Sequence, residues 1–116
     1  MVTLMSCNSN LINCEKYKLG DYKLRFDKNE ILITRDRLYQ TEYYLGDSTK
    51  YEIEWISDCE YKLNLVETSI TSDLSELDTL IRTEILETYE SGYKFKSVGN
   101  TNSNPFEGII SMYRFP

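Results

Sequence analysis

The sequence predicts an all-β fold: an antiparallel meander of about eight strands that forms a small barrel or a strongly curved sheet. Three observations predict it. Apolar residues alternate with polar ones from Tyr22 onward, turn-forming residues separate the alternating segments at regular spacing, and tyrosine, which favours strands, occurs ten times. An eight-stranded barrel has an interior that side chains fill or that holds one small ligand.

The alternation places the strands in order along the chain. The predicted strands are residues 22–26, 30–35, 38–45, 50–55, 59–65, 80–89, 93–98 and 108–115. The clearest of them is 50–55, where Tyr51, Ile53 and Trp55 alternate with charged residues. We expect it to pair with 59–65 as an antiparallel hairpin, with opposite charges facing each other on the solvent side.

One segment departs from the alternation. Asp73 and Glu76 have the spacing of a helix capping box, in which each residue satisfies a backbone N–H of the first turn. We expect at most one short helix here, near residues 73–79. A polar crossover loop is the alternative.

Charge and composition exclude several classes of chemistry. The 13 basic and 19 acidic residues give a net charge of −6, and the basic residues are scattered among acidic ones. Such a chain repels phosphates on average, so no nucleic-acid partner is expected. Histidine is absent, which removes the commonest general base and the commonest metal ligand. We expect no catalytic residue, no metal site and no cofactor.

The N-terminal segment carries a possible targeting signal. Residues 4–7, Leu-Met-Ser-Cys, followed by a short polar run, resemble the end of a bacterial lipoprotein signal peptide, whose cysteine becomes the lipidated N-terminus. The resemblance implies that Cys7 is the lipid attachment site, that residues 1–13 are a signal remnant and tether, and that residues 14–116 form a single β domain. The alternative is a disordered N-terminal tail on a cytoplasmic protein.

The other two cysteines allow a disulfide. With Cys7 lipidated, Cys14 and Cys59 remain, and in an oxidising compartment they would be natural partners. Closing about 45 residues of chain stabilises the fold by roughly 4 kcal/mol in the loop-entropy description. Two buried free thiols are the alternative. No cysteine lies in a C-x-x-C pair, so a structural zinc site is not expected.

Short motifs over residues 14–66 resemble a widespread group of small bacterial envelope proteins of unassigned function. The matching motifs are Cys14, Gly20-Asp21-Tyr22, Ile33-Thr34-Arg35, Gln40-Thr41-Glu42, Ile53-Glu54-Trp55 and Asp58-Cys59-Glu60-Tyr61-Lys62-Leu63. More distantly, the architecture is similar to the lipocalin-like (calycin) barrels, with Gly20-Asp21-Tyr22 where those proteins have Gly-x-Trp. The resemblance implies a fold and an envelope location rather than a particular ligand.

Four residues are candidates for a ligand pocket: Arg35, Gln40, Glu42 and Trp55. In a barrel, the second to fourth strands would bring them together, and a polar cluster with one aromatic wall is typical of small-ligand sites. The alternative is that the charged members face solvent and Trp55 belongs to the core. The adjacent tyrosines 43 and 44 place one ring on each face of their strand, so at least one is expected to be exposed.

These observations predict a non-enzymatic binding or interaction module of the bacterial cell envelope, lipid-anchored or periplasmic. Its partner would be a small ligand or another envelope protein. One alternative is a lipocalin-like carrier of a small apolar ligand, which requires an internal cavity. The least favoured alternative is a hydrolase that uses carboxylates alone, with Asp73, Glu76 and Asp78 as the densest acidic cluster.

Overall fold

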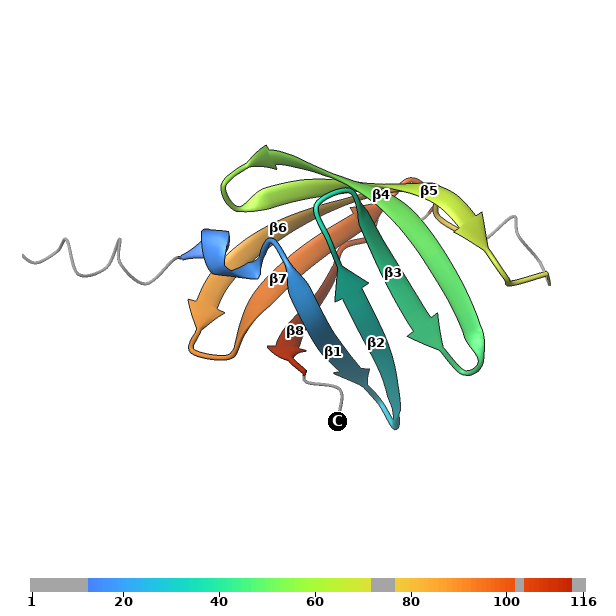
Figure 1. Cartoon of the computed structure of the whole chain (residues 1–116), viewed down its shortest axis with the longest axis horizontal. Helices are drawn as coiled ribbons and strands as arrows, with labels where there is room; N and C mark the ends of the chain where they lie inside the picture. The colour runs from blue at the N-terminus through green and yellow to red at the C-terminus, as the bar shows by residue number, and fades with distance from the viewer. Residues whose placement is uncertain (1–12, 72–76, 102–103, 114–116) are drawn as a thin grey trace, which may run out of the picture.

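The computed structural model describes residues 13–71, 77–101 and 104–113 of the chain. Eight antiparallel strands close into a barrel in which each strand pairs with the next and β8 pairs with β1 (Figure 1). The strands are β1 (Gly20–Phe26), β2 (Asn29–Arg35), β3 (Tyr39–Tyr44), β4 (Asp47–Ser57), β5 (Glu60–Thr68), β6 (Leu80–Tyr89), β7 (Gly92–Gly99) and β8 (Phe106–Met112). In the described part of the chain, a 3-10 turn, η1 (Cys14–Tyr17), precedes them; this turn was not predicted.

The predicted all-β meander is confirmed, and the sheet closes rather than remaining open and curved. The predicted helix near 73–79 falls largely on residues that the structure does not describe, Asp73 and Glu76 included. Its described part, residues 77–79, forms no helix. Cys7 and the rest of the predicted tether up to residue 12 also lie outside the described residues.

Several predicted strand ends were wrong. The turn between β3 and β4 is centred on Leu45 and Gly46, whose φ angles are 51° and 87°. Glycine tolerates this left-handed conformation, so the chain reverses there and β4 starts at Asp47, earlier than predicted. The last strand ends at Met112 rather than near 115. Residues 114 and 115 lie outside the described part.

The predicted hairpin of β4 and β5 is confirmed. Ile53 pairs with Leu63 on the inner face, and Glu54 pairs with Lys62 on the outer face. The Glu54 carboxylate lies 3.6 Å from the Lys62 ammonium, so opposite charges do face each other in solvent. An exposed pair of this kind adds at most about 1 kcal/mol to stability.

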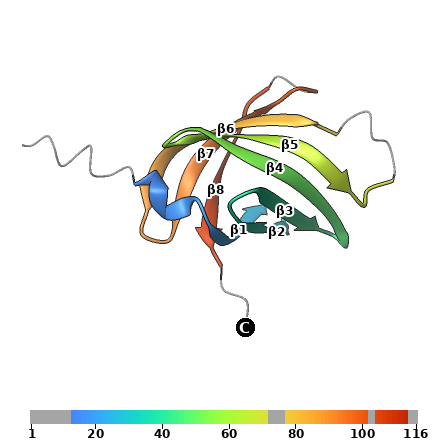
Figure 2. The ribbon, with the colours of Figure 1, turned by 45° about the horizontal axis from the view of Figure 1, so that its top comes forward.

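The predicted disulfide joins Cys14 to Cys59, with the two Cα atoms 5.3 Å apart. The disulfide attaches η1 to the turn between β4 and β5, at one end of the barrel (Figure 2). Cys14 is 3 % exposed. This contact holds η1 over that end.

The interior is filled near η1. Four tyrosines there are at most 2 % exposed, and a buried arginine, Arg35, lies among them. The four are Tyr17, Tyr22, Tyr61 and Tyr93. Tyr17 comes from η1 and the others from β1, β5 and β7, so the turn and the barrel wall build this packed end together.

At Gly92 the backbones of β7 and β8 lie close together. A Cβ atom built on it would lie 2.3 Å from the Ile110 carbonyl oxygen, and its N–H donates to the Tyr17 hydroxyl at 3.0 Å. We expect Gly92→Ala to lower the free energy of unfolding by about 1–3 kcal/mol, because β7 and β8 must separate. Urea unfolding measures this, with Ser91→Ala, at an exposed neighbour, as the control. A Gly92→Ala midpoint equal to that of the native chain would contradict the predicted clash.

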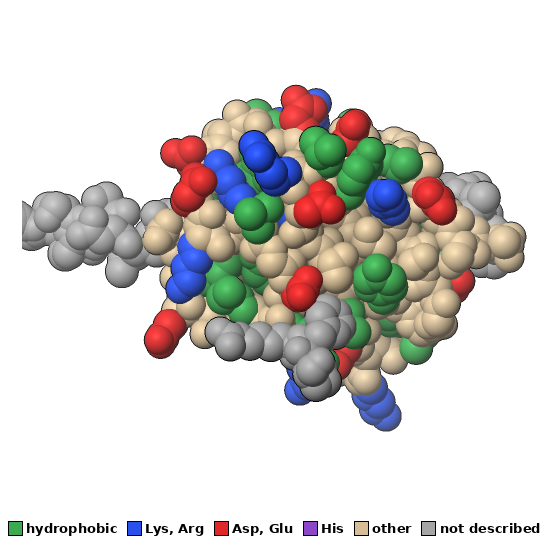
Figure 3. All heavy atoms as spheres, viewed as in Figure 1, with side chains coloured by type: hydrophobic (Ala, Val, Ile, Leu, Met, Phe, Trp, Pro, Cys, Tyr) green, Lys and Arg blue, Asp and Glu red, His purple; other side chains and the backbone are tan. Residues whose placement is uncertain are grey.

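The outer surface mixes charges of both signs. On the face seen in Figure 3, acidic and basic side chains are interspersed with isolated hydrophobic ones. Among the described residues, no three potential ligand side chains gather as a metal site. The same part of the chain contains no helix with the length and hydropathy to cross a membrane.

Candidate functional site

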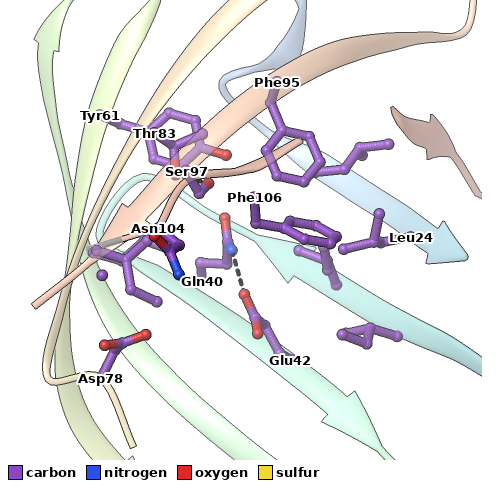
Figure 4. Close-up of a pocket in the computed structure, with 16 residues that line it drawn as sticks. Leu24, Gln40, Glu42, Tyr61, Asp78, Thr83, Phe95, Ser97, Asn104 and Phe106 are labelled. Carbon is purple, nitrogen blue, oxygen red and sulfur yellow. Dashed lines mark hydrogen bonds between the residues drawn. The ribbon is translucent and has the colours of Figure 1, made fainter. Parts of the chain in front are cut away.

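The barrel contains a cavity of about 370 Å³ at the end away from η1 (Figure 4). Most of its wall is aliphatic or aromatic, from Leu24, Ile31, Ile33, Tyr61, Leu63, Ile81, Phe95, Phe106 and Ile110. The remaining wall is polar, from Gln40, Glu42, Asp78, Thr83, Ser97, Gly99 and Asn104. Strand alternation produces this wall, because every second residue of each strand points inward.

The structure brings together three of the four predicted pocket residues. Arg35 Nε donates to Gln40 Oε1 at 2.8 Å, and Gln40 Nε2 donates to a Glu42 carboxylate oxygen at 2.9 Å. Gln40 and Glu42 line the cavity, while Arg35 lies behind Gln40 toward the packed end. The three therefore form a hydrogen-bonded row that runs from the filled half of the interior into the hollow half.

Trp55, the fourth predicted residue, does not belong to this row. Its ring packs on Tyr61 with centroids 4.8 Å apart, and the Lys18 ammonium lies 5.1 Å above it. Trp55 is half-buried at the η1 end and does not line the cavity. The β-bulge between Trp55 and Ser57 interrupts the pairing at this point of β4.

Arg35 is a buried cation surrounded by phenol rings. Besides Gln40, its guanidinium donates to the Tyr17 carbonyl at 2.7 Å and to the Tyr93 and Tyr61 hydroxyls at 2.9 and 3.3 Å. Burial would lower the pKa of Arg35, but the oxygens of Tyr93 and Tyr61 outweigh burial and raise that pKa above its ordinary value. Arg35 stays charged in the folded protein.

Glu42 is an ionisable group that lines the cavity. Burial raises the pKa of its carboxyl above the ordinary value of 4.5. The hydrogen bond from Gln40 and the charge of Arg35 lower this pKa only in part. The carboxylate is therefore less stable here than in water.

This raised pKa has a consequence for stability. The folded protein keeps the Glu42 proton at pH values where the unfolded chain has released it, so stability falls as pH rises from about 4.5 through the raised pKa. We expect Glu42→Gln to remove this fall and to exceed the native stability near neutral pH. Urea unfolding at a series of pH values measures it, with the exposed Glu52→Gln as the control. The prediction fails if the native chain and Glu42→Gln show parallel pH profiles.

Asp78 supplies a second carboxylate at the mouth of the cavity. One of its oxygens accepts a hydrogen bond from the Thr101 N–H at 2.7 Å, and the carboxylate lies against Gly99, which has no Cβ to obstruct it. The sequence singled out Asp78 only as part of an acidic cluster. Its place in the cavity wall depends on the long-range contact with Thr101, for which the sequence contains no local signal.

No family model matches the chain, and no curated protein or solved structure matches it either. Its class follows from the structure alone. The fold and the cavity define a small, closed, eight-stranded β-barrel with one packed end and one hollow end.

Proposed function

We propose that this chain is a non-enzymatic binding module that holds a small, largely apolar molecule inside the barrel. The observation that supports the proposal is the cavity. Its volume of about 370 Å³ lies at the small end of the range of about 300–1,000 Å³ typical of ligand pockets. At the volume of about 30 Å³ that a water molecule takes in the liquid, it has room for on the order of ten non-hydrogen atoms.

The lining favours an apolar body for the ligand. Eight of the lining side chains are aliphatic or phenylalanine rings, and burying an apolar ligand against them gains about 25 cal/mol per Å². Phe106 lines the cavity and is 45 % exposed, which gives the mouth an apolar edge. A bound molecule would cover this ring.

A variant that fills the cavity tests the proposal. Ile81→Trp places an indole where the ligand would lie, and Ile109→Trp makes the same exchange at an outward position that is 53 % exposed. Isothermal titration of octanol should show binding to the native chain and to Ile109→Trp, and none to Ile81→Trp. Equal binding to all three proteins, or to none, would contradict the proposal.

The location that we propose is the bacterial envelope, with a lipid on Cys7 that holds the barrel on a membrane surface. Residues 4–7 support it through their resemblance to a lipoprotein signal peptide. The Cys14–Cys59 disulfide supports it because disulfides persist in oxidising compartments. Expression with the natural upstream sequence in a Gram-negative host, followed by intact-mass measurement, tests it. A diacyl or triacyl mass that starts at Cys7 is expected, and an unmodified chain with three alkylatable thiols would contradict it.

A second candidate function is hydrolysis by two carboxylates. The observation in its favour is that Glu42 and Asp78 line one cavity. Against it, the cavity is too small for a disaccharide, and Asp78 is engaged by Thr101. Turnover of a small nitrophenyl ester or glycoside that is lost in both Glu42→Gln and Asp78→Asn would support this candidate. No turnover above the buffer rate would remove it.

A further inference from the structure

We propose that the ligand of the cavity is a short aliphatic amine. Its protonated amino group would pair with Glu42. The inference rests on the proposed function and names the chemical class of the ligand. It depends on three observations: the unused hydrogen-bonding capacity of Glu42, the absence of a cation lining the cavity within the described chain, and a second carboxylate in the cavity wall.

Glu42 has most of its hydrogen-bonding capacity free. An ionised carboxylate accepts about four hydrogen bonds. Within the described residues, Glu42 accepts one, from Gln40 Nε2 to a single oxygen at 2.9 Å. Figure 4 shows its carboxylate projecting from β3 into the cavity, on the same side as Asp78. A donor in the cavity can therefore reach it.

The nearest cation of the chain cannot provide that donor. Each of the three guanidinium nitrogens of Arg35 already donates, to Gln40, to the Tyr17 carbonyl and to the phenol oxygens of the packed end. Gln40 stands between the guanidinium and Glu42, so the charge of Arg35 acts on Glu42 only from a distance and forms no direct hydrogen bond with it. No Lys or other Arg lines the cavity in the described part of the chain. Burying a carboxylate without a cation costs free energy, and a cationic ligand group would offset this cost.

The charge of the cavity wall also favours a cation. Asp78 lines the cavity with a second carboxylate. An ammonium group in the cavity would be attracted by the negative charges of both Glu42 and Asp78.

The same arrangement disfavours other head groups. A carboxylate or phosphate ligand would meet two negative side chains and be repelled. An alcohol would donate one hydrogen bond to Glu42 but leave its charge unpaired. A charge-assisted hydrogen bond is stronger than a neutral one by an amount that corresponds to roughly ten- to hundredfold in affinity. We expect the amine to exceed the alcohol by about this factor.

The experiment is isothermal titration of the oxidised full chain near neutral pH with octylamine, octanol and octanoate, which share one aliphatic body. Octylamine is expected to bind about ten- to hundredfold more tightly than octanol, and octanoate most weakly. In Glu42→Gln, octylamine should lose most of its advantage over octanol. The matched control, Glu52→Gln, removes an exposed carboxylate of β4 and should change none of the three.

The outcomes separate the inference from the proposed function. Octanol binding that Ile81→Trp abolishes, together with no preference for octylamine, would overturn the amine inference and leave the binding function standing. An octylamine affinity that Glu42→Gln leaves unchanged would also overturn it. Binding of none of the three compounds would overturn both proposals.

Discussion

Replacing Arg35 by alanine is expected to lower the free energy of unfolding by about 3–5 kcal/mol, one of the two largest effects that we predict for a change in this chain. The side chain is 4 % exposed and lies at the centre of the packed end. Its removal would leave a cavity and would deprive the Tyr17 carbonyl and Gln40 of their donor. Buried polar groups without partners are destabilising in addition to the lost packing.

The phenol rings add to this dependence on Arg35. Its guanidinium carbon lies 4.8, 5.0 and 5.9 Å from the ring centroids of Tyr22, Tyr61 and Tyr93. A cation over desolvated aromatic faces stabilises by about 2 kcal/mol in favourable cases. Arg35→Lys should also be strongly destabilising, because one compact ammonium cannot replace a planar group that bonds in several directions.

Urea unfolding followed by tyrosine near-ultraviolet circular dichroism measures this effect. Arg37→Ala, which removes an exposed arginine from the turn before β3, is the matched control and should stay within about 0.5 kcal/mol of the native chain. Arg35→Met separates charge from volume and should lose less stability than Arg35→Ala. A loss below about 1 kcal/mol for Arg35→Ala would show that the packed end does not depend on the cation.

The burial of Arg35 could be predicted from the sequence because strand alternation has a strict period of two. Arg35 is in phase with Ile31 and Ile33, and the structure places all three toward the interior. On β3 the period is ambiguous, because Tyr39 and Tyr43 lie in the phase opposite to Gln40 and Glu42. The polar cluster was therefore predicted only alongside the alternative that its charged members face solvent. Local pattern was sufficient for β2, but on β3 it did not show which face is buried, since Gln40 is 2 % exposed and Tyr43 44 %.

Alternation could not show which end of the barrel is filled and which is hollow. That depends on Tyr17, which sits in a 3-10 turn without any strand period and enters the packed end from outside the sheet. It also depends on side-chain volumes from strands that are not sequence neighbours. Trp55 shows the same limit: its phase predicted burial, but a bulge and the end of β4 leave it half-buried and away from the cavity.

Removing the Cys14–Cys59 disulfide is the second large effect that we predict. The bond spans 45 residues, and the loop-entropy relation gives about 4 kcal/mol for the constraint it places on the unfolded chain. Cys14→Ser with Cys59→Ser should therefore unfold at much lower urea concentration than the native chain, and reductant should have the same effect on the native chain alone. Cys7→Ser leaves both partners in place and is the control. Unchanged stability under reductant would contradict the prediction.

The disulfide and Arg35 should also be energetically coupled. The bond fixes η1 to the barrel, and η1 presents the Tyr17 carbonyl that accepts from Arg35 at 2.7 Å. If η1 detaches when the bond is lost, part of the packing around Arg35 is lost with it. We expect the triple variant, with Arg35→Ala added to the two serine substitutions, to lose less stability than the sum of the separate losses, by about 0.5–3 kcal/mol. Strict additivity would mean that the disulfide stabilises only through the unfolded chain and that η1 stays in place without it.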